Sequence, residues 1–288
     1  MNRMQELLYP GDPAEVQPRQ TLKTGTPEIH LISAPDDLLQ WLNDGWRDLW
    51  RAPSALLHGL LVSAVGAILV WATWARPSLS IALIFGFLLV GPILAMGVND
   101  LARRLERGES TTFRTGLGAV REVGGGAWIF AAILITLFAL WASFIWLWIG
   151  VMNVGILEGP VAPTTMLGSM LATPQGVISL IGAFAAWITF ALVVFGISLV
   201  TLPALLDRRR GLVDAIGTSL RALNSNLPAM LLWGVIITGL FAISAATAFL
   251  ALIVIFPWLG FAMWRGYRAM VTHDGGPAVR DDARLVDG

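Results

Sequence analysis

Apolar residues fall in six long runs along this chain, and shorter amphipathic stretches lie between them. The runs cover residues 54–75, 79–100, 127–150, 177–206, 228–246 and 248–266. A membrane with a hydrocarbon core of about 30 Å is crossed by about 20 residues of helix, so each run predicts one transmembrane helix. The last two runs lie within 38 residues that carry no formal charge, Leu227 to Trp264. One helix of that length would measure about 57 Å, so we expect it to turn once, near 244–248.

Three shorter stretches show hydrophobic residues at a helical period, and each precedes a pair of runs. Their stripes are Leu38, Leu42, Trp46 and Leu49; Phe113, Leu117 and Val120; and Val213, Ile216, Leu220 and Leu223. A one-sided apolar stripe with flanking Trp and Arg is typical of helices at the water–lipid boundary. The pattern predicts an all-α polytopic membrane helical bundle. It has six transmembrane helices as three hairpins, each preceded by a short amphipathic interfacial helix.

The two ends of the chain lack this periodicity. Residues 1–34 are rich in Pro, Thr and Gly, and residues 272–288 are polar and mostly acidic. Such segments bury too little apolar surface to fold alone. We predict disordered cytoplasmic tails over 1–34 and 272–288, on either side of a six-span membrane domain at 35–271.

Composition supports a membrane protein. Hydrophobic residues make up 56% of the 288 residues and charged residues 13%, and the mean hydropathy is +0.71. Soluble domains run at about 45–50% apolar and about 25% charged. The net charge is zero, so nucleic acid is not an expected partner, and the lipid bilayer is. Without cysteine the chain has no disulfide, thiolate metal site or cysteine nucleophile.

The arginines predict the orientation. With six spans, 13 arginines of the membrane domain fall on one side and only Arg76 on the other. Cytoplasmic loops carry the excess of positive charge. We therefore expect a multi-pass protein of the bacterial inner (cytoplasmic) membrane with both termini cytoplasmic.

Three prolines are candidate helix breaks: Pro92, Pro203 and Pro257. Pro92 precedes Arg103 by eleven residues, as Pro257 precedes Arg268, whereas Pro203 is only five residues from Arg208. This spacing is one of several short matches that suggest three related hairpins.

A proline inside a helix leaves the carbonyl four residues back without its donor, here Leu88 or Ile253. Unwound backbone of this kind can form a substrate or ion site. No ionisable residue lies within a proposed span away from its ends. Because such residues usually mark ion pathways, we favour packing kinks over a site.

Small residues four apart permit close helix contact. The pairs are Gly59/Ser63, Gly91/Ala95, Gly182/Ala186 and Ala242/Ala246. They are compatible with a membrane-protein partner or a homo-oligomer, although such pairs are common in any bundle.

Two arginine clusters are candidate contacts for lipid headgroups or for a partner: Arg103, Arg104 and Arg107, and Arg208, Arg209 and Arg210. Topology-setting charge explains the same residues. His58 is interpreted as an interfacial polar residue, because haem or metal chemistry needs several histidines in the membrane. The sequence predicts no catalytic residue, no metal site and no cofactor.

Three segments carry a family resemblance: the helix from Trp41 to Trp50, the break leading to Asn99-Asp100-Leu101-Ala102-Arg103-Arg104, and the stretch from Leu231-Leu232-Trp233-Gly234 to Pro257-Trp258-Leu259-Gly260. They resemble a bacterial family of predicted integral membrane proteins, domain of unknown function 2189. The resemblance covers roughly 36–271. It implies an inner-membrane helical bundle and brings no catalytic residue.

These observations favour a non-enzymatic accessory, assembly or envelope-organising protein that acts through contacts. The alternative is a transporter or permease for a neutral or apolar solute that uses the proline-broken helices.

Overall fold

Helices account for nearly all of the regular structure. The computed structural model describes residues 27–73, 77–152, 163–208 and 211–272. The helices are α1 (Asp36–Arg51), α2 (Ala55–Thr73), α3 (Pro77–Leu94), α4 (Met96–Glu106), α5 (Phe113–Val123), α6 (Gly125–Met152), α7 (Pro163–Leu171), α8 (Pro174–Ser198), α9 (Thr201–Arg208), α10 (Leu212–Ser225), α11 (Leu227–Ala246) and α12 (Leu252–Met270). Two short strands, β1 (Glu28–Ile29) and β2 (Val271–Thr272), pair with each other.

Five helical segments of the described residues are long and apolar enough to cross a membrane. They are Ala55–Thr73, Ala82–Glu106, Gly125–Met152, Pro174–Asp207 and Leu227–Ala246. The prediction of an all-α membrane bundle is therefore confirmed. The sixth predicted span corresponds to α12, which is not among the five, so six spans are not confirmed. Its last turns carry Arg265 and Arg268, which dilute its apolar part.

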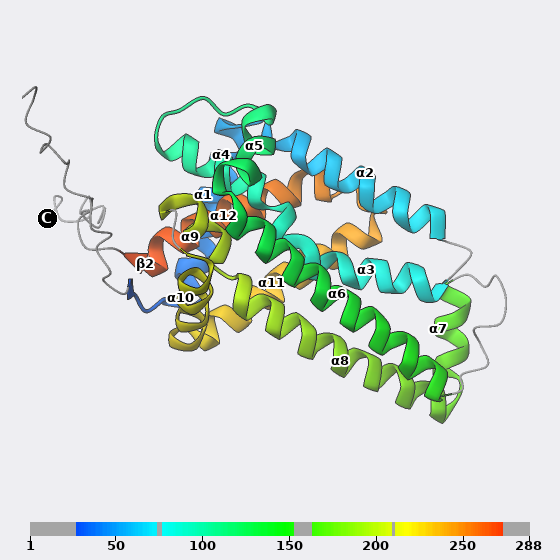
Figure 1. Cartoon of the computed structure of the whole chain (residues 1–288). Helices are drawn as coiled ribbons and strands as arrows, with labels where there is room; N and C mark the ends of the chain where they lie inside the picture. Colours follow the sequence, from blue (N-terminus) through cyan, green and yellow to red (C-terminus); the bar gives the residue numbers. More distant parts are fainter. Residues whose placement is uncertain (1–26, 74–76, 153–162, 209–210, 273–288) are drawn as a thin grey trace, which may run out of the picture. The chain divides into compact units, whose positions relative to one another are not determined.

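Within the unit formed by residues 29–271, the axes of the long helices lie roughly along one line, and the chain runs up and down between them. Figure 1 shows α2, α3, α6 and α8 extending side by side from the end that holds α1, α4 and α9. The core between them is closely packed and rich in aromatic residues. Trp141, Trp233 and Phe130 are among its largest fully buried side chains.

Amphipathic α1 packs along the second half of α12. Its Gly45 meets the backbone of Ala262, and the ring of Trp41 lies against Gly266. The indole Nε1 of Trp258 donates a hydrogen bond of 2.7 Å to the carbonyl of Leu42. The apolar face of α1 is thus covered by protein. Trp46 and Trp50, at the edge of this face, remain 40% and 54% exposed, and the ring of Trp46 lies 5.4 Å from that of Trp258.

The α11–α12 hairpin ends beside the middle of α2. The hydroxyl of Ser63 donates a 2.8 Å hydrogen bond to the carbonyl of Phe249 in the hairpin turn. Phe249 also packs with Val62 and Leu252 in a small buried cluster. Ten residues of α2 lie beyond Ser63, which corresponds to about 15 Å of helix. Figure 1 shows the hairpin stopping short of the far ends of α2 and α3.

The three candidate helix breaks take different positions. Pro92 lies near the end of α3, and α4 begins after only one intervening residue, Ala95. Pro203 occupies the first turn of α9, where a missing amide donor costs little. Pro257 lies inside α12.

The remaining predictions concern the amphipathic stretches and the tails. Most of the predicted tails, 1–26 and 273–288, lies outside the described residues. The amide of His30, in the described part, donates a 2.9 Å hydrogen bond to the carbonyl of Met270. Helix α7 lies between the third and fourth predicted spans. On α10 the small residues Ala215 and Ala222 are buried, whereas Val213 of the predicted stripe is 82% exposed.

Candidate functional site

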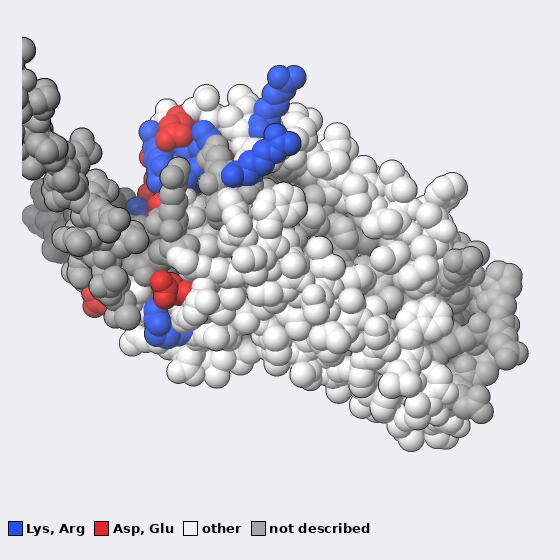
Figure 2. All heavy atoms as spheres, in the orientation of Figure 1, with Lys and Arg blue, Asp and Glu red and all other residues white. Residues whose placement is uncertain are grey.

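The first candidate site is a cluster of charged side chains that we call the ionic cap: Asp48, Asp100, Arg103, Arg104, Glu106, Arg107, Asp207, Arg265 and Arg268. These residues come from α1, α4, α9 and α12. Figure 2 shows the basic and acidic side chains of the described residues gathered toward one end of the visible face, and the other described residues on that face are white. The long helices run from this end, so the cap marks one end of the membrane domain.

Asp100 lies at the centre of the cap. Its side chain is fully buried, and its two carboxylate oxygens accept hydrogen bonds from Nε of Arg103 at 3.0 Å and Nε of Arg104 at 2.7 Å. Arg103 also donates from Nη1 to the carbonyl of Leu206 at 2.9 Å, which ties α4 to α9. A buried carboxylate is tolerated only when it is paired and hydrogen-bonded in this way.

A second group of pairs joins α12 to the same helices. Arg268 reaches Glu106 at 3.0 Å and Asp207 at 3.5 Å, and Arg107 reaches Asp207 at 3.5 Å. The indole Nε1 of Trp264 donates to Glu106 at 2.8 Å. These side chains are more exposed than Asp100, so their ion pairs are weaker.

Asp48 connects α1 to α12. Its side chain is 6% exposed, and its Oδ2 lies 2.6 Å from Nε of Arg265. The amphipathic helix is therefore held by an ion pair as well as by its apolar face.

The structure places the predicted arginines unequally. Arg103 and Arg104 are only 14% and 16% exposed and turn inward to Asp100, whereas Arg107 is 46% exposed. The side chains of Arg208, Arg209 and Arg210 lie outside the described residues. Contact between these arginines and a lipid headgroup or a partner stays a prediction.

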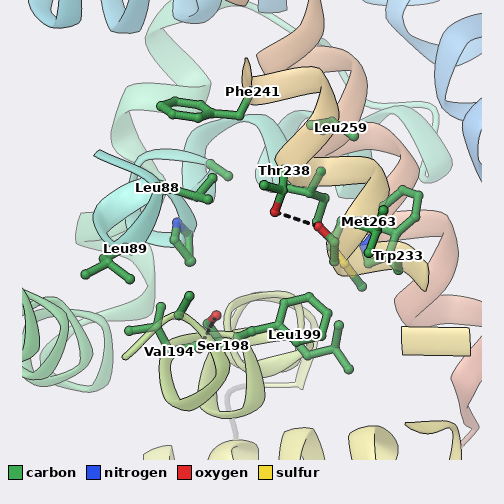
Figure 3. A pocket seen from close by; sticks show the side chains of 18 of the residues that line it. Leu88, Leu89, Val194, Ser198, Leu199, Trp233, Thr238, Phe241, Leu259 and Met263 are labelled. Carbon is green, nitrogen blue, oxygen red and sulfur yellow. Dashed lines mark hydrogen bonds between the residues drawn. The ribbon is translucent and has the colours of Figure 1, made fainter. Parts of the chain in front are cut away.

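The second candidate site is a cavity of about 670 Å³ between α3, α8, α11 and α12. Apolar side chains line most of it; Figure 3 shows Leu88 and Leu89 on one side and Trp233, Leu259 and Met263 on the other. Its volume lies in the range of about 300–1,000 Å³ that is usual for ligand sites. We call it the intramembrane pocket, because the segments that line it are those described above as apolar runs.

Two buried polar atoms of the pocket residues have no hydrogen-bond partner among the described residues: Oδ1 of Asn99 and Nε1 of Trp233. Asn99 is 3% exposed and Trp233 is fully buried. By contrast, the hydroxyl groups of Ser198 and Thr238 donate to carbonyls of their own helices, at 2.6 and 2.8 Å. Figure 3 shows the second of these bonds. An unpaired buried polar group costs about 1–3 kcal/mol, so such atoms call for an explanation.

Only some of the proline breaks belong to the pocket. Pro92 and Pro203 line it, together with Leu88, the residue whose carbonyl Pro92 leaves without a donor. Pro257 is buried and is not among the lining residues. Pro92 and Pro257 therefore do not line the same cavity.

His58 is buried between helices. Its ring lies 4.6 Å from that of Phe113, and it fills the space next to Gly97 and Gly116. A Cβ at Gly116 would come within 2.6 Å of its Nε2. The histidine thus packs α2 against α4 and α5 and is only 4% exposed.

The comparisons with known proteins place the chain in a class. Residues 79–207 match the model of a family described as "Predicted integral membrane protein (DUF2189)". The expected resemblance is thereby confirmed over that part of the chain, and the protein is an integral membrane protein. No curated protein and no solved structure matches the chain.

Sequence reasoning missed Asn99 and Trp233. In the sequence, Asn99 stands in the Asn-Asp pair before the arginines and Trp233 stands in a segment that carries the family resemblance, and neither is predicted as a site residue. One feature of the sequence does point to Asn99. Its side-chain amide lies at the end of an apolar run, one helical turn before Arg103, where a buried amide needs a hydrogen-bond partner.

Proposed function

We propose that this chain is a non-enzymatic protein of the bacterial inner membrane that acts through contacts, as an accessory, assembly or envelope-organising protein. The ionic cap carries this proposal, because its charges hold the chain's own helices together. Asp100 has the most buried carboxylate of the cap, and both of its oxygens pair with Arg103 and Arg104. The surfaces left for other molecules are then mainly the apolar flanks of the long helices.

The outer face of α6 fits such a role. Trp128, Trp146 and Leu147 are 61%, 58% and 67% exposed on it. Aromatic residues are enriched where membrane helices meet the interface and where proteins meet partners. We propose that this flank contacts a membrane-protein partner or a second copy of the chain.

We further propose that the ionic cap faces the cytoplasm, which also places both termini there. The support is the positive-inside rule, applied to the arginines that the cap and the neighbouring helices carry. The residues flanking the far ends of the long helices include only one arginine, Arg76.

We infer that α11 and α12 form a re-entrant hairpin in place of two complete spans. The Ser63 hydroxyl holds the hairpin turn at the middle of α2. Irregular backbone inside a membrane must be satisfied by protein, and this hydrogen bond does so for the Phe249 carbonyl. A re-entrant hairpin returns the chain to the side it came from, so both termini stay on the cap side.

A crosslinking experiment tests the contact role. A photoreactive amino acid at Trp128 is activated in native membranes, and the tagged chain is purified and analysed by mass spectrometry. We expect one stoichiometric polypeptide, lost when Ile135, which is 56% exposed on the same helix, is changed to Arg. The matched control carries the photoreactive residue at Ser110, in the connection between α4 and α5. No adduct from Trp128, or the same adducts from both positions, would contradict the proposal.

A further inference from the structure

The intramembrane pocket has the length of one leaflet. Its lining residues run along α3 and α4 from Phe87 to Asn99, and along α11 from Met230 to Ala242. Each stretch covers twelve residue steps, about 18 Å. Half of the hydrocarbon core measures about 15 Å. A molecule that fills the pocket lengthwise therefore has the reach of a single acyl chain.

The two ends of the pocket differ chemically. Asn99, with its unpartnered carbonyl oxygen, lies one helical turn from Arg103 of the ionic cap. The opposite end is lined by Phe87, Phe241 and Leu252. A bound molecule is thus expected to place a polar group near the cap and an apolar tail toward the aromatic end.

The orphan atoms define that polar group. Oδ1 of Asn99 needs a donor and Nε1 of Trp233 needs an acceptor. A hydroxyl group supplies both. None of the described lining residues carries a formal charge, so the pocket offers no counter-ion for a carboxylate or phosphate.

We infer that the intramembrane pocket binds one acyl chain of a neutral, hydroxyl-bearing lipid such as a monoacylglycerol, with its hydroxyl at Asn99 and Trp233. The lipid enters sideways from the leaflet next to the ionic cap. The volume of about 670 Å³, the one-leaflet length and the two unpartnered polar atoms carry this inference. It does not depend on the accessory role proposed above.

The test uses the full chain in lipid nanodiscs and a photoactivatable monoacylglycerol as the probe. The blocking variant is Gly239→Trp, because Gly239 lines the pocket and a side chain there meets open space. The matched control is Gly150→Trp, a helical glycine of α6 that also meets open space and does not line the pocket. We expect labelling on α3 and α11 in the wild type, about tenfold weaker labelling in Gly239→Trp, and unchanged labelling in Gly150→Trp.

A second variant tests the polar end. Asn99→Leu keeps the number and branching of the side-chain heavy atoms but removes the acceptor. We expect the wild type to prefer the monoacylglycerol probe over its hydroxyl-free analogue by about tenfold, which corresponds to about one hydrogen bond. The Asn99→Leu variant should show a clearly smaller preference, because only Nε1 of Trp233 is left to bind the hydroxyl.

Four results would overturn the inference. Equal labelling of the wild type and Gly239→Trp, or labelling spread over the outer face of α6, would mean surrounding bilayer lipid only. A free fatty acid probe that labels as well as the monoacylglycerol would show that the site does not select a neutral head. Crosslinks from α11 pocket positions to a polypeptide would assign the pocket to a partner helix.

Discussion

The two proline-containing arms of the bundle share a sequence spacing but differ in surroundings. In the first arm, α3 and α4, Pro92 precedes Arg103 by eleven residues; in the second, α12, Pro257 precedes Arg268 by the same number. Pro92 lines the intramembrane pocket, whereas Pro257 is buried in the packed interior. The same backbone break thus forms a pocket wall in one arm and a helix contact in the other.

Glycine explains how the second arm packs so closely. The carbonyl of Ile253, which Pro257 leaves without a donor, lies directly against Gly59 of α2. A Cβ at Gly59 would overlap this carbonyl. Among the described residues, none comes equally close to the first arm at Gly91, where a Cβ would meet open space. Packing by the neighbouring helix therefore decides whether a proline break is closed or left open.

The largest effect is expected where the first arm joins the ionic cap. Asp100→Ala removes the partner of Arg103 and Arg104 and leaves poorly solvated charges, so it should cost about 3–5 kcal/mol of stability. In the second arm Arg268→Ala removes ion pairs to Glu106 and Asp207 in which the arginine is 41% exposed, and it should cost about 1 kcal/mol. Thermal unfolding of both variants in mild detergent measures the difference, and equal losses would mean that the two arms are anchored alike.

The next effect concerns the contact between α2 and the second arm. Gly59→Ala makes a methyl group overlap with the Ile253 carbonyl oxygen and should lower the stability by about 1–3 kcal/mol. Gly66→Ala in the same helix is the control, because a Cβ there would lie 3.5 Å or more from its neighbours. We expect Gly66→Ala to leave the melting temperature unchanged or to raise it. A tolerated Gly59→Ala would show that the close contact is not required.

A smaller loss is expected from the hydrogen bond at the hairpin turn. Ser63→Ala leaves the Phe249 carbonyl without its donor and should cost about 1–2 kcal/mol. Ser143→Ala is the matched control, since that hydroxyl binds only Ala139 of its own exposed helix face. The same detergent assay, repeated on both variants, separates them; a larger loss in Ser143→Ala would contradict the role assigned to Ser63.

The smallest effect is a gain. Ala248 has a φ of 51°, a left-handed conformation that glycine adopts more readily. We expect Ala248→Gly to stabilise the turn by about 0.5–1 kcal/mol. Ala245→Gly, in the regular part of α11, should cost about the same amount. Melting temperatures that shift in the same direction for both variants would argue against a strained turn.

The sequence predicts the helical bundle because membrane insertion imposes long apolar runs. It also predicts that Gly59 and Ser63 permit a close contact, and the structure places both against the α11–α12 hairpin. The small-residue pattern does not name the partner segment, because that depends on packing between distant parts of the chain. For the same reason the length of the last apolar run does not reveal where its hairpin ends.

The pocket could not be predicted from Pro92 alone. Its walls come from four segments, and only their packing leaves Asn99 and Trp233 without partners. The sequence also does not reveal that Arg103 and Arg104 turn inward to Asp100. Their spacing of three and four residues from Asp100 on one helix only permits these ion pairs.

Thiol labelling tests the re-entrant α11–α12 hairpin most directly, because the chain has no cysteine of its own. Single cysteines are placed at Leu250 in the α11–α12 turn, at Ala172 between α7 and α8, and at Ser110 between α4 and α5. If the hairpin is re-entrant, a membrane-impermeant maleimide labels A172C from one side and S110C from the other, while L250C reacts from neither side until the protein is denatured. Labelling of L250C from the same side as A172C in intact cells would show that α11 and α12 cross the membrane completely.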